Sequence, residues 1–138
     1  MIGSEEQDAF VRSMKACVVT TLRKDGSPAT SVLFYAVDGD ELLLSTTKDR
    51  LKAQTLRRDP RIVVTVLDEG APYQYVSVEG TARLEDDDLV AAHTLINRAM
   101  RGAPEWAPPE GFEARLKGEG RVVIRVTPGR VSGVVRRG

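Results

Sequence analysis

The pattern of hydrophobic and polar positions changes its period several times along the chain, and each change predicts a new element. Residues 5–14 carry apolar side chains at helical spacing directly after Ser4, a residue that favours helix caps, so we expect a short opening helix. The segments 16–22 and 29–37 are rich in β-branched and aromatic residues and flank a turn sequence, which is typical of two strands. The chain therefore begins with one helix followed by β-structure.

The dipeptide Asp38-Gly39 lies between two apolar runs and predicts a tight hairpin. The run after it, residues 41–46, should therefore pair antiparallel with residues 29–37. Together with the strand before it, this hairpin predicts a three-stranded meander.

Helical periodicity replaces the strand pattern from about residue 47 to residue 58. We expect Leu51 and Leu56 on the inward side of this helix. Asp59 should end it, because a residue that precedes a proline avoids helical backbone angles.

The second half of the chain continues with mostly β-structure. The patterns predict a strand over 61–67, a strand over 73–84 with a bulge or bend at Gly80, an amphipathic helix over 86–100, a loop over 102–112 with a short helical turn near 113–117, and one or two strands within 121–135. We find no repeat or linker. The expected architecture is therefore one domain over residues 1–138, a small antiparallel barrel with peripheral helices.

Composition restricts the classes of function. Twenty basic residues balance twenty acidic ones, so no global field draws the chain to nucleic acid or to anionic lipid, and any anion site must be local. No run approaches the roughly 20 apolar residues of a membrane-spanning helix, and the start lacks the features of a signal peptide. We expect a cytoplasmic protein without a nucleic-acid or membrane partner.

Cysteine and histidine each occur once, as Cys17 and His93, which excludes an intramolecular disulfide and a cysteine-based zinc site. Cys17 lies in an apolar strand and is expected to be a buried small hydrophobe. His93 lies in a predicted helix without ligand partners at metal-binding spacing, so we expect a packing or interface residue and no metal site.

The predicted helix over 47–58 begins with the cations Lys48, Arg50 and Lys52, although helix starts favour anions by roughly 0.3 to 1 kcal/mol per charge. A bound phosphate would resolve this conflict, because hydroxyls, helix N–H groups, a planar guanidinium and an ammonium all bind phosphate. We call the predicted set the phosphate cradle. It consists of Ser45, Thr46, Thr47, Arg50 and Lys52.

A structural alternative remains open at these residues. The cations would then be solvated, or paired with Asp49 and Asp59, since surface ion pairs worth about 0 to 1 kcal/mol are common without any function. The context favours the anion site, because the cluster follows a hairpin directly and the strand 29–35 is long enough to support a flat ring.

The same residues carry a resemblance to a known family. The segments "TTLRKDGSPATSVLFYAVDGDELLLSTTKDRLKAQTLRRDPR" and "PYQYVSVEGTARL" are similar to the split β-barrel flavin and deazaflavin oxidoreductases of the pyridoxamine-phosphate-oxidase-like superfamily, above all to the actinobacterial branch that binds coenzyme F420. The resemblance implies an α+β, mainly β fold: a split β-barrel of six or seven antiparallel strands with peripheral helices.

The resemblance also implies a homodimer with two cofactor sites at the subunit interface. In such a dimer the phosphate cradle holds the phosphate, the flat ring lies along the start of the strand 29–37, and the segment 73–75 of the partner subunit closes the site. The implied ring-binding and closing residues are Ala29, Thr30, Ser31, Val32, Tyr73, Gln74 and Tyr75. Whether Arg57, Arg58, Arg136 and Arg137 contact a cofactor tail or a substrate is left open.

The implied function is an F420-dependent oxidoreductase that transfers a hydride between the cofactor and a conjugated small molecule, such as a quinone-like compound, an enone or a tetrapyrrole. The alternatives are an FMN-binding oxidase or reductase of the same fold and a non-catalytic cofactor carrier. Vitamin B6 oxidation is disfavoured, because the end "SGVVRRG" lacks the tryptophan of that enzyme's C-terminal signature. The sequence names no catalytic residue, which suits an enzyme whose cofactor performs the chemistry.

Overall fold

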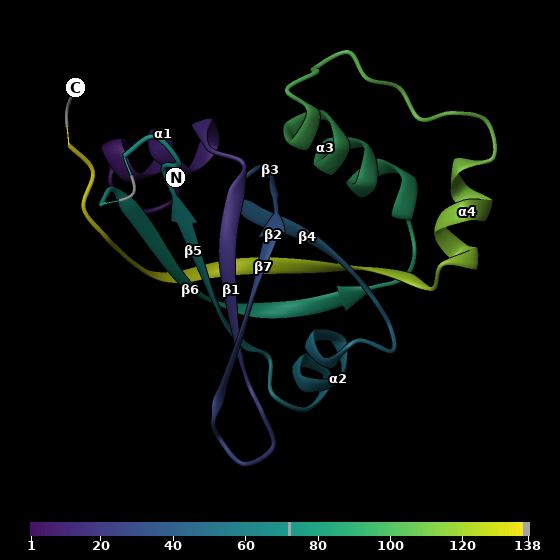
Figure 1. The fold of residues 1–138 in the computed structure, drawn as a ribbon, viewed down its shortest axis with the longest axis horizontal. Helices are drawn as coiled ribbons and strands as arrows, with labels where there is room; N and C mark the ends of the chain where they lie inside the picture. Colours follow the sequence, from purple (N-terminus) through teal and green to yellow (C-terminus); the bar gives the residue numbers. More distant parts are fainter. Residues whose placement is uncertain (72, 137–138) are drawn as a thin grey trace.

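The computed structural model describes residues 1–71 and 73–136. Seven strands in this part of the chain form one antiparallel sheet in the order β2-β1-β5-β6-β7-β4-β3, accompanied by four helices (Figure 1). The elements are α1 (Glu5–Ser13), β1 (Ala16–Leu22), β2 (Pro28–Phe34), β3 (Ala36–Asp38), β4 (Glu41–Thr47), α2 (Leu51–Arg58), β5 (Arg61–Leu67), β6 (Tyr75–Glu85), α3 (Leu89–Arg101), α4 (Phe112–Gly118) and β7 (Arg121–Ser132).

Tyr35 closes the sheet into a barrel. The strands β2 and β3 lie at opposite edges of the sheet, yet Tyr35 alone separates them in sequence. Since neighbouring Cα atoms are only about 3.8 Å apart, the sheet must curl until its two edges meet at this residue. The fold is therefore a split β-barrel.

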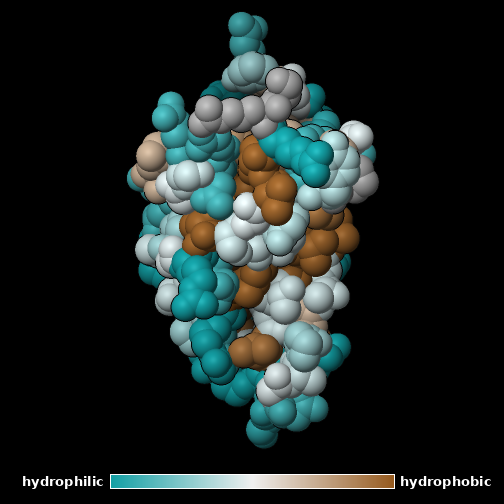
Figure 2. Space-filling model, turned by 90° about the vertical axis from the view of Figure 1, so that its left-hand side faces the viewer, coloured by the Kyte–Doolittle hydropathy of each residue, from teal (hydrophilic) through white to brown (hydrophobic). Residues whose placement is uncertain are grey.

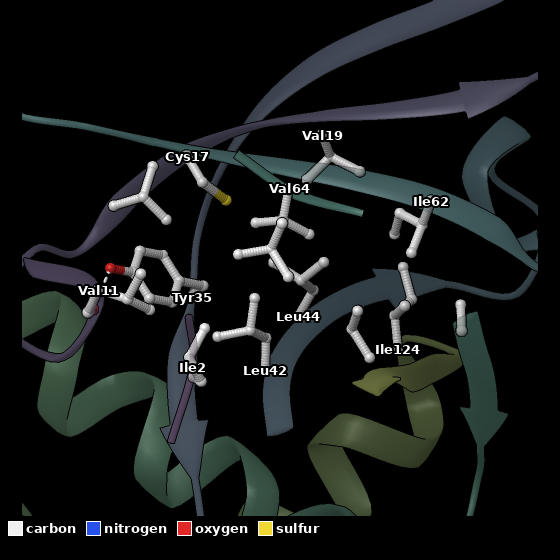
Figure 3. Packing of buried hydrophobic residues seen from close by; sticks show 14 of the residues in the cluster. Ile2, Val11, Cys17, Val19, Tyr35, Leu42, Leu44, Ile62, Val64 and Ile124 are labelled. Atoms are coloured by element: carbon white, nitrogen blue, oxygen red, sulfur yellow. Dashed lines mark hydrogen bonds between the residues drawn. The ribbon is translucent and has the colours of Figure 1, made fainter. Parts of the chain in front are cut away.

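The interior of the barrel is filled by aliphatic side chains that alternate along the strands (Figure 3). Tyr35 is buried among them and donates a hydrogen bond from its hydroxyl to the carbonyl oxygen of Val11 in α1. Cys17 faces the same interior, where burial raises the pKa of its thiol to about 12. The expected inert, buried cysteine is confirmed.

Replacing Tyr35 with phenylalanine is expected to destabilise the protein by about 1–3 kcal/mol, because the carbonyl oxygen of Val11 would lose its buried donor while the ring still fills its space. Urea denaturation measures this change. A Ser13→Ala variant is a suitable control, since it removes a hydroxyl that donates to the same helix outside the barrel interior. Equal stability of Tyr35→Phe and the unaltered protein would contradict a stabilising role for this hydrogen bond.

The helices cover only part of the barrel. The helices α3 and α4 pack on the outer face of β3, β4 and β7, where their buried side chains form a second hydrophobic cluster with Leu43 and Val123. In Figure 1 these two helices lie together on one side, while α1 and α2 lie at opposite ends of β1 and β5. None of the helices in the described part of the chain combines the length and hydrophobicity that a membrane crossing requires.

The outer face of β2, β1, β5 and β6 has no such cover. Among the described residues, no outward side chain of these strands is buried, and Val32 and Phe34 in β2 are 73% and 43% exposed. Strand pairing places Phe34, Ala16, Leu67 and Tyr75 in one row across this face. Figure 2 views the molecule from the left-hand side of Figure 1 and shows hydrophobic side chains gathered in an interrupted band along it. We call this surface the open sheet face.

Most of the predicted elements are present, but two predictions were wrong in detail. The strand predicted over 29–37 bends at Tyr35, so that its first part pairs only with β1 and its second part only with β4. The expected three-stranded meander is therefore split between two edges of the sheet. A local pattern cannot reveal this, because both parts have the same strand-like composition.

The helix α2 begins at Leu51, four residues later than expected, and Leu51 is 51% exposed although Leu56 is buried. Leu56 lies five positions after Leu51, which places the two side chains about 140° apart around a helix with 3.6 residues per turn. They cannot both face inward. The inward face instead carries Ala53, Thr55 and Leu56.

Candidate functional site

The amino-terminal end of α2 is the centre of the predicted site. Arg50 is its N-cap residue and makes no side-chain capping hydrogen bond, and the first turn contains no acidic residue. Lys52 follows in the first turn, where partial burial, together with the neighbouring Arg50, lowers the pKa of its ammonium. Two cations therefore lie at the positive end of a helix, an arrangement that repels itself electrostatically.

Neither cation has an anionic partner in the described part of the chain. Asp59 forms its ion pair with Arg61 at 2.6 Å, which contributes to lowering the pKa of Asp59 to about 2. The Thr47 hydroxyl, followed by the charges of Arg50 and Lys48, lowers the pKa of Asp49, but no ion pair within 4 Å joins Asp49 to Arg50 or Lys52. Ion pairs of Arg50 or Lys52 with Asp49 and Asp59 are therefore absent within 4 Å, and solvation of the two cations remains the structural alternative to an anion site.

The three hydroxyls of the phosphate cradle lie on β4 rather than on the helix. Because side chains alternate along a strand, Ser45 and Thr47 lie on the outer face while Thr46 points into the barrel. Thr47 thus lies at the end of β4, and Arg50 and Lys52 follow it at the start of α2. The three hydroxyls of Ser45, Thr46 and Thr47, however, do not lie on one side of the strand.

Ser45 is already engaged. Its Oγ lies 2.6 Å from Nε2 of His93 in α3, and Nη1 of Arg121 donates to the same oxygen at 3.4 Å. Nδ1 of His93 lies 2.8 Å from the carbonyl oxygen of Leu89, which can only accept, so the neutral ring donates from Nδ1 and accepts from Ser45 at Nε2. Burial lowers the pKa of His93 and favours this neutral form. His93 is therefore a buried packing residue that holds Ser45.

Thr46 is buried, and its Oγ1 has no hydrogen-bond partner in the described part of the chain. An unsatisfied buried hydroxyl costs about 1–3 kcal/mol. Because Thr46 points into the barrel, its hydroxyl does not join the outward-facing members of the phosphate cradle. The fit to a phosphate-bearing ligand therefore depends on Arg50 and Lys52, at the start of α2.

The predicted ring-binding segment lies beside α2. Ala29 pairs with Thr21 of β1, and Oγ1 of Thr55 in α2 donates to Oγ1 of Thr21 at 3.3 Å. Thr30 and Val32 point to the open sheet face, while Ala29 and Ser31 point to the other side of β2 and are half-buried. The phosphate cradle and the start of β2 are thus near neighbours at one end of the barrel.

A basic hollow that the sequence pattern did not reveal lies between the β1–β2 turn and α2. It has a volume of about 360 Å³. Its lining residues are Arg23, Lys24, Asp25, Leu51, Thr55 and Arg58. The one carboxylate in this lining, Asp25, is engaged by Ser27. The sequence signal was the pair Arg23-Lys24 in a turn, but tertiary contacts of α2 with the end of β1, such as that between Thr55 and Thr21, bring this turn to α2.

Positive charge is concentrated at this end of a chain whose formal net charge is zero. The segments 23–25 and 48–61 contain eight basic residues and three acidic ones. Two of these cations serve the fold: Arg57 donates to the carbonyl oxygen of Lys48 and Arg58 to that of Leu22, each at 3.0 Å. Local charge of one sign raises the concentration of anionic ligands near a surface.

The segment 73–75 lies at the other end of the barrel. The seven residues of β5 separate it from α2, which corresponds to about 20 Å at roughly 3.3 Å per residue. Tyr73 and Tyr75 are 60% and 37% exposed, and Arg136 lies over the ring of Tyr73 at 5.3 Å. One protomer therefore does not bring these residues to the phosphate cradle. Arg137 lies outside the described residues.

Comparison with known proteins gives this arrangement a context. A sequence model described as pyridoxamine 5'-phosphate oxidase matches residues 4–135. A solved structure described as an F420 reductase is 25% identical, with a TM-score of 0.71, and the match covers 95% of this chain and 98% of that one. A conserved hypothetical protein from Mycobacterium tuberculosis is 26% identical with a TM-score of 0.76, over 96% of this chain and 84% of the other.

A third structure shares the fold at lower identity. It is described as a FAD-binding protein from Mesorhizobium loti and is 20% identical with a TM-score of 0.70, over 96% of this chain and 94% of that one. The family match spans nearly the whole described chain. The descriptions of the similar structures name a deazaflavin, F420, in one case and a flavin, FAD, in another. The chain belongs to the pyridoxamine 5'-phosphate oxidase family and has the split-barrel fold of its flavin- and deazaflavin-binding oxidoreductases.

Proposed function

We propose that this protein is an F420-dependent oxidoreductase that transfers a hydride between the deazaflavin and a conjugated small molecule. The observation that carries the proposal is the start of α2, where Arg50 and Lys52 have no anionic partner in the described part of the chain. Such a pair at a helix N-terminus is costly without a ligand and favourable with a phosphate between its members. The similarity to a protein described as an F420 reductase supports the same cofactor.

Several of the predicted site residues have a binding role in this proposal. The guanidinium of Arg50 and the ammonium of Lys52 hold the phosphate, and Thr47 lies beside them at the end of β4. Backbone groups along the start of β2 orient the flat ring, with Ala29, Thr30, Ser31 and Val32 in this segment. The bound cofactor supplies the hydride chemistry, while the protein binds it, orients it and excludes water.

The basic hollow favours F420 over FMN. Both cofactors carry a phosphate beside a tricyclic ring, but FMN ends at its phosphate whereas F420 continues into an acidic tail. Lys24 and Arg58 line a hollow whose one carboxylate is already engaged, and it adjoins the same helix as the phosphate cradle. An acidic tail that leaves the cradle along α2 would find these cations, and FMN would leave them unused.

The site would be completed in a homodimer. The open sheet face exposes apolar side chains that no described helix covers, and a second copy of the chain is the partner that would bury it. The distance of about 20 Å along β5 between α2 and the segment 73–75 supports a site shared between two protomers. In the dimer, Tyr73 and Tyr75 of one protomer would close over the ring held by its partner.

Replacing Lys24 with glutamate is expected to weaken F420 binding about three- to tenfold and to leave FMN binding nearly unchanged, since a reversed charge at a partly solvated position costs on the order of 1 kcal/mol. Isothermal titration with each cofactor at low salt measures both affinities. The effect should shrink at high ionic strength because salt screens exposed charges. Lys117→Glu on α4 is the matched control. An equal loss for both cofactors would argue against a tail site.

The proposal as a whole is tested by titrating the purified protein with F420 and, separately, with FMN. Tight, selective F420 binding followed by turnover of quinone-like, enone or tetrapyrrole acceptors with the reduced cofactor would support it. Selective FMN binding would transfer the protein to the flavin-dependent branch. F420 binding without turnover of any acceptor would favour a cofactor carrier.

A further inference from the structure

The described residues of the loop between β5 and β6, 68–71 and 73–74, include a carboxylate that accepts several hydrogen bonds. Oδ1 of Asp68 accepts hydrogen bonds from the backbone N–H groups of Gly70 at 2.9 Å and Ala71 at 3.2 Å. Residues of this loop also form one wall of a cavity of about 630 Å³ between α1, the start of β1 and the end of α3. The position of the loop therefore determines the shape of a cavity as well as the place of Tyr73.

The end of the chain packs against this loop. We call residues 133–136 the C-terminal strap. The carbonyl oxygen of Val134 accepts from the backbone N–H of Tyr75 at 3.1 Å, and Val135 packs against the barrel core. The strap thereby extends the pairing of β7 with β6 beyond its last regular residue, Ser132.

Gly133 allows this close approach. Its backbone has φ +129°, a conformation that side chains rarely adopt, and a Cβ at this position would collide with the carbonyl oxygen of Tyr75. Glycine is the residue that meets both requirements, because it lacks a Cβ. The strap is therefore a packed segment fitted to the start of β6.

Gln74 joins the strap to the loop through both ends of its carboxamide. Its Oε1 accepts from the backbone N–H of Arg136 at 2.7 Å, and its Nε2 donates to Oδ2 of Asp68 at 3.4 Å. Arg136 in turn lies over the exposed ring of Tyr73. The polar atoms of Gln74 are thus engaged within the protomer, which leaves Tyr73 and Tyr75 as the exposed side chains of this segment.

We propose that Gln74 is a positioning residue that latches the C-terminal strap to the β5–β6 loop and so sets the place of Tyr73 and Tyr75 for ligand closure. The proposal rests on the proposed function in assigning these tyrosines to the cofactor site. It replaces the expected direct contact between Gln74 and the cofactor with an indirect role. The latch itself is a property of the single chain and is testable without any cofactor.

The test exchanges the donor and the acceptor between Gln74 and Asp68. Gln74→Glu places two carboxylates at the 3.4 Å contact, whereas Asp68→Asn combined with Gln74→Glu restores one donor and one acceptor there. The glutamate still accepts from Arg136, and the asparagine still accepts from Gly70. Hydrogen–deuterium exchange of residues 68–75 is the first readout, and the affinity for the cofactor that the unaltered protein binds is the second.

We expect Gln74→Glu to accelerate amide exchange in residues 68–75 and to weaken cofactor binding about five- to tenfold, the scale of one or two hydrogen bonds. The double variant should restore both quantities to within about twofold, because the two sites are directly coupled. Gln7→Glu in α1 is the matched control for an amide-to-acid change, since a glutamate serves equally well in its capping box. The melting temperature should be similar in all variants.

Three results would overturn the latch. Unchanged exchange in Gln74→Glu would show that the contact does not hold the loop. Accelerated exchange with unchanged cofactor affinity would show that the latch does not position the closing tyrosines, and a double variant no better than Gln74→Glu would exclude the direct coupling. Failure of the proposed function looks different: the unaltered protein would bind neither F420 nor FMN, while the exchange experiment would still report on the latch.

Discussion

Replacing Val32 with aspartate is expected to convert the protein into a monomer and to weaken cofactor binding by more than about 100-fold. Val32 is 73% exposed in the edge strand β2, on the open sheet face, so the change should be tolerated within one protomer. In a dimer the same position would be buried, and an unpaired buried charge costs several kcal/mol. Size-exclusion chromatography with light scattering measures the mass, and cofactor titration measures the affinity.

Ala107→Asp is the control for this experiment. It introduces the same charge at an exposed position in the loop between α3 and α4, which lies on the covered side of the barrel. It should change neither the mass nor the affinity. A Val32→Asp protein that remains dimeric would remove the open sheet face as the interface, and a monomer that binds the cofactor fully would mean that one chain contains the whole site.

Arg50→Ala and Lys52→Ala are each expected to weaken binding of F420 about ten- to hundredfold, because a hydrogen bond to a charged group contributes about 1.5–3 kcal/mol. Both cations lie at the start of α2 without an anionic partner in the described part of the chain, so their removal breaks no ion pair. Isothermal titration measures the affinities. Lys117→Ala on α4 is the control, since it removes an exposed lysine whose ion pair is with Glu113 of the same helix.

Lys52 should lower the stability of the ligand-free protein. Its pKa is lowered in the folded state by burial and by Arg50, so the charged form is disfavoured on folding. Lys52→Met should therefore raise the melting temperature of the ligand-free protein at neutral pH while it weakens ligand binding. The difference should diminish as pH rises above the lowered folded-state pKa, where Lys52 becomes neutral in the folded protein. A variant that loses stability and keeps its affinity would contradict the assignment.

Much of the fold follows from local patterns. The strand β5 has the predicted boundaries, the opening helix has the predicted cap at Ser4, and the bulge near Gly80 lies where the alternation breaks. At Gly80 a Cβ would lie 2.6 Å from the carbonyl oxygen of Thr127, so the bulge has a steric reason that the sequence showed only as a glycine in a strand. The strand boundaries and the helix cap depend on near neighbours in sequence, which is why the pattern was sufficient for them.

The features that the sequence pattern did not predict depend on contacts between residues far apart in the chain. The bend at Tyr35 exists because β2 and β3 pair with different strands, and nothing within residues 29–37 specifies that division. In the candidate site, the pattern indicated the cations of α2, but not that Ser45 would be engaged by His93, 48 residues away. The basic hollow and the latch at Gln74 likewise join segments far apart in the chain. Their binding roles remain predictions.

The position of β7 in the sheet has a consequence for the order in which the protein folds. This strand lies between β6 and β4, so the pairing of β4 waits for a partner roughly 80 residues later in the chain, as between Leu42 and Val126. Contacts of such long sequence separation slow folding, because loop closure must precede them. During synthesis, the β3–β4 hairpin would leave the ribosome long before β7, and β4 would remain without its second partner. The apolar segment Leu42, Leu43 and Leu44, fully buried in the folded protein, is thus exposed to aggregation in the nascent chain until β7 has been made.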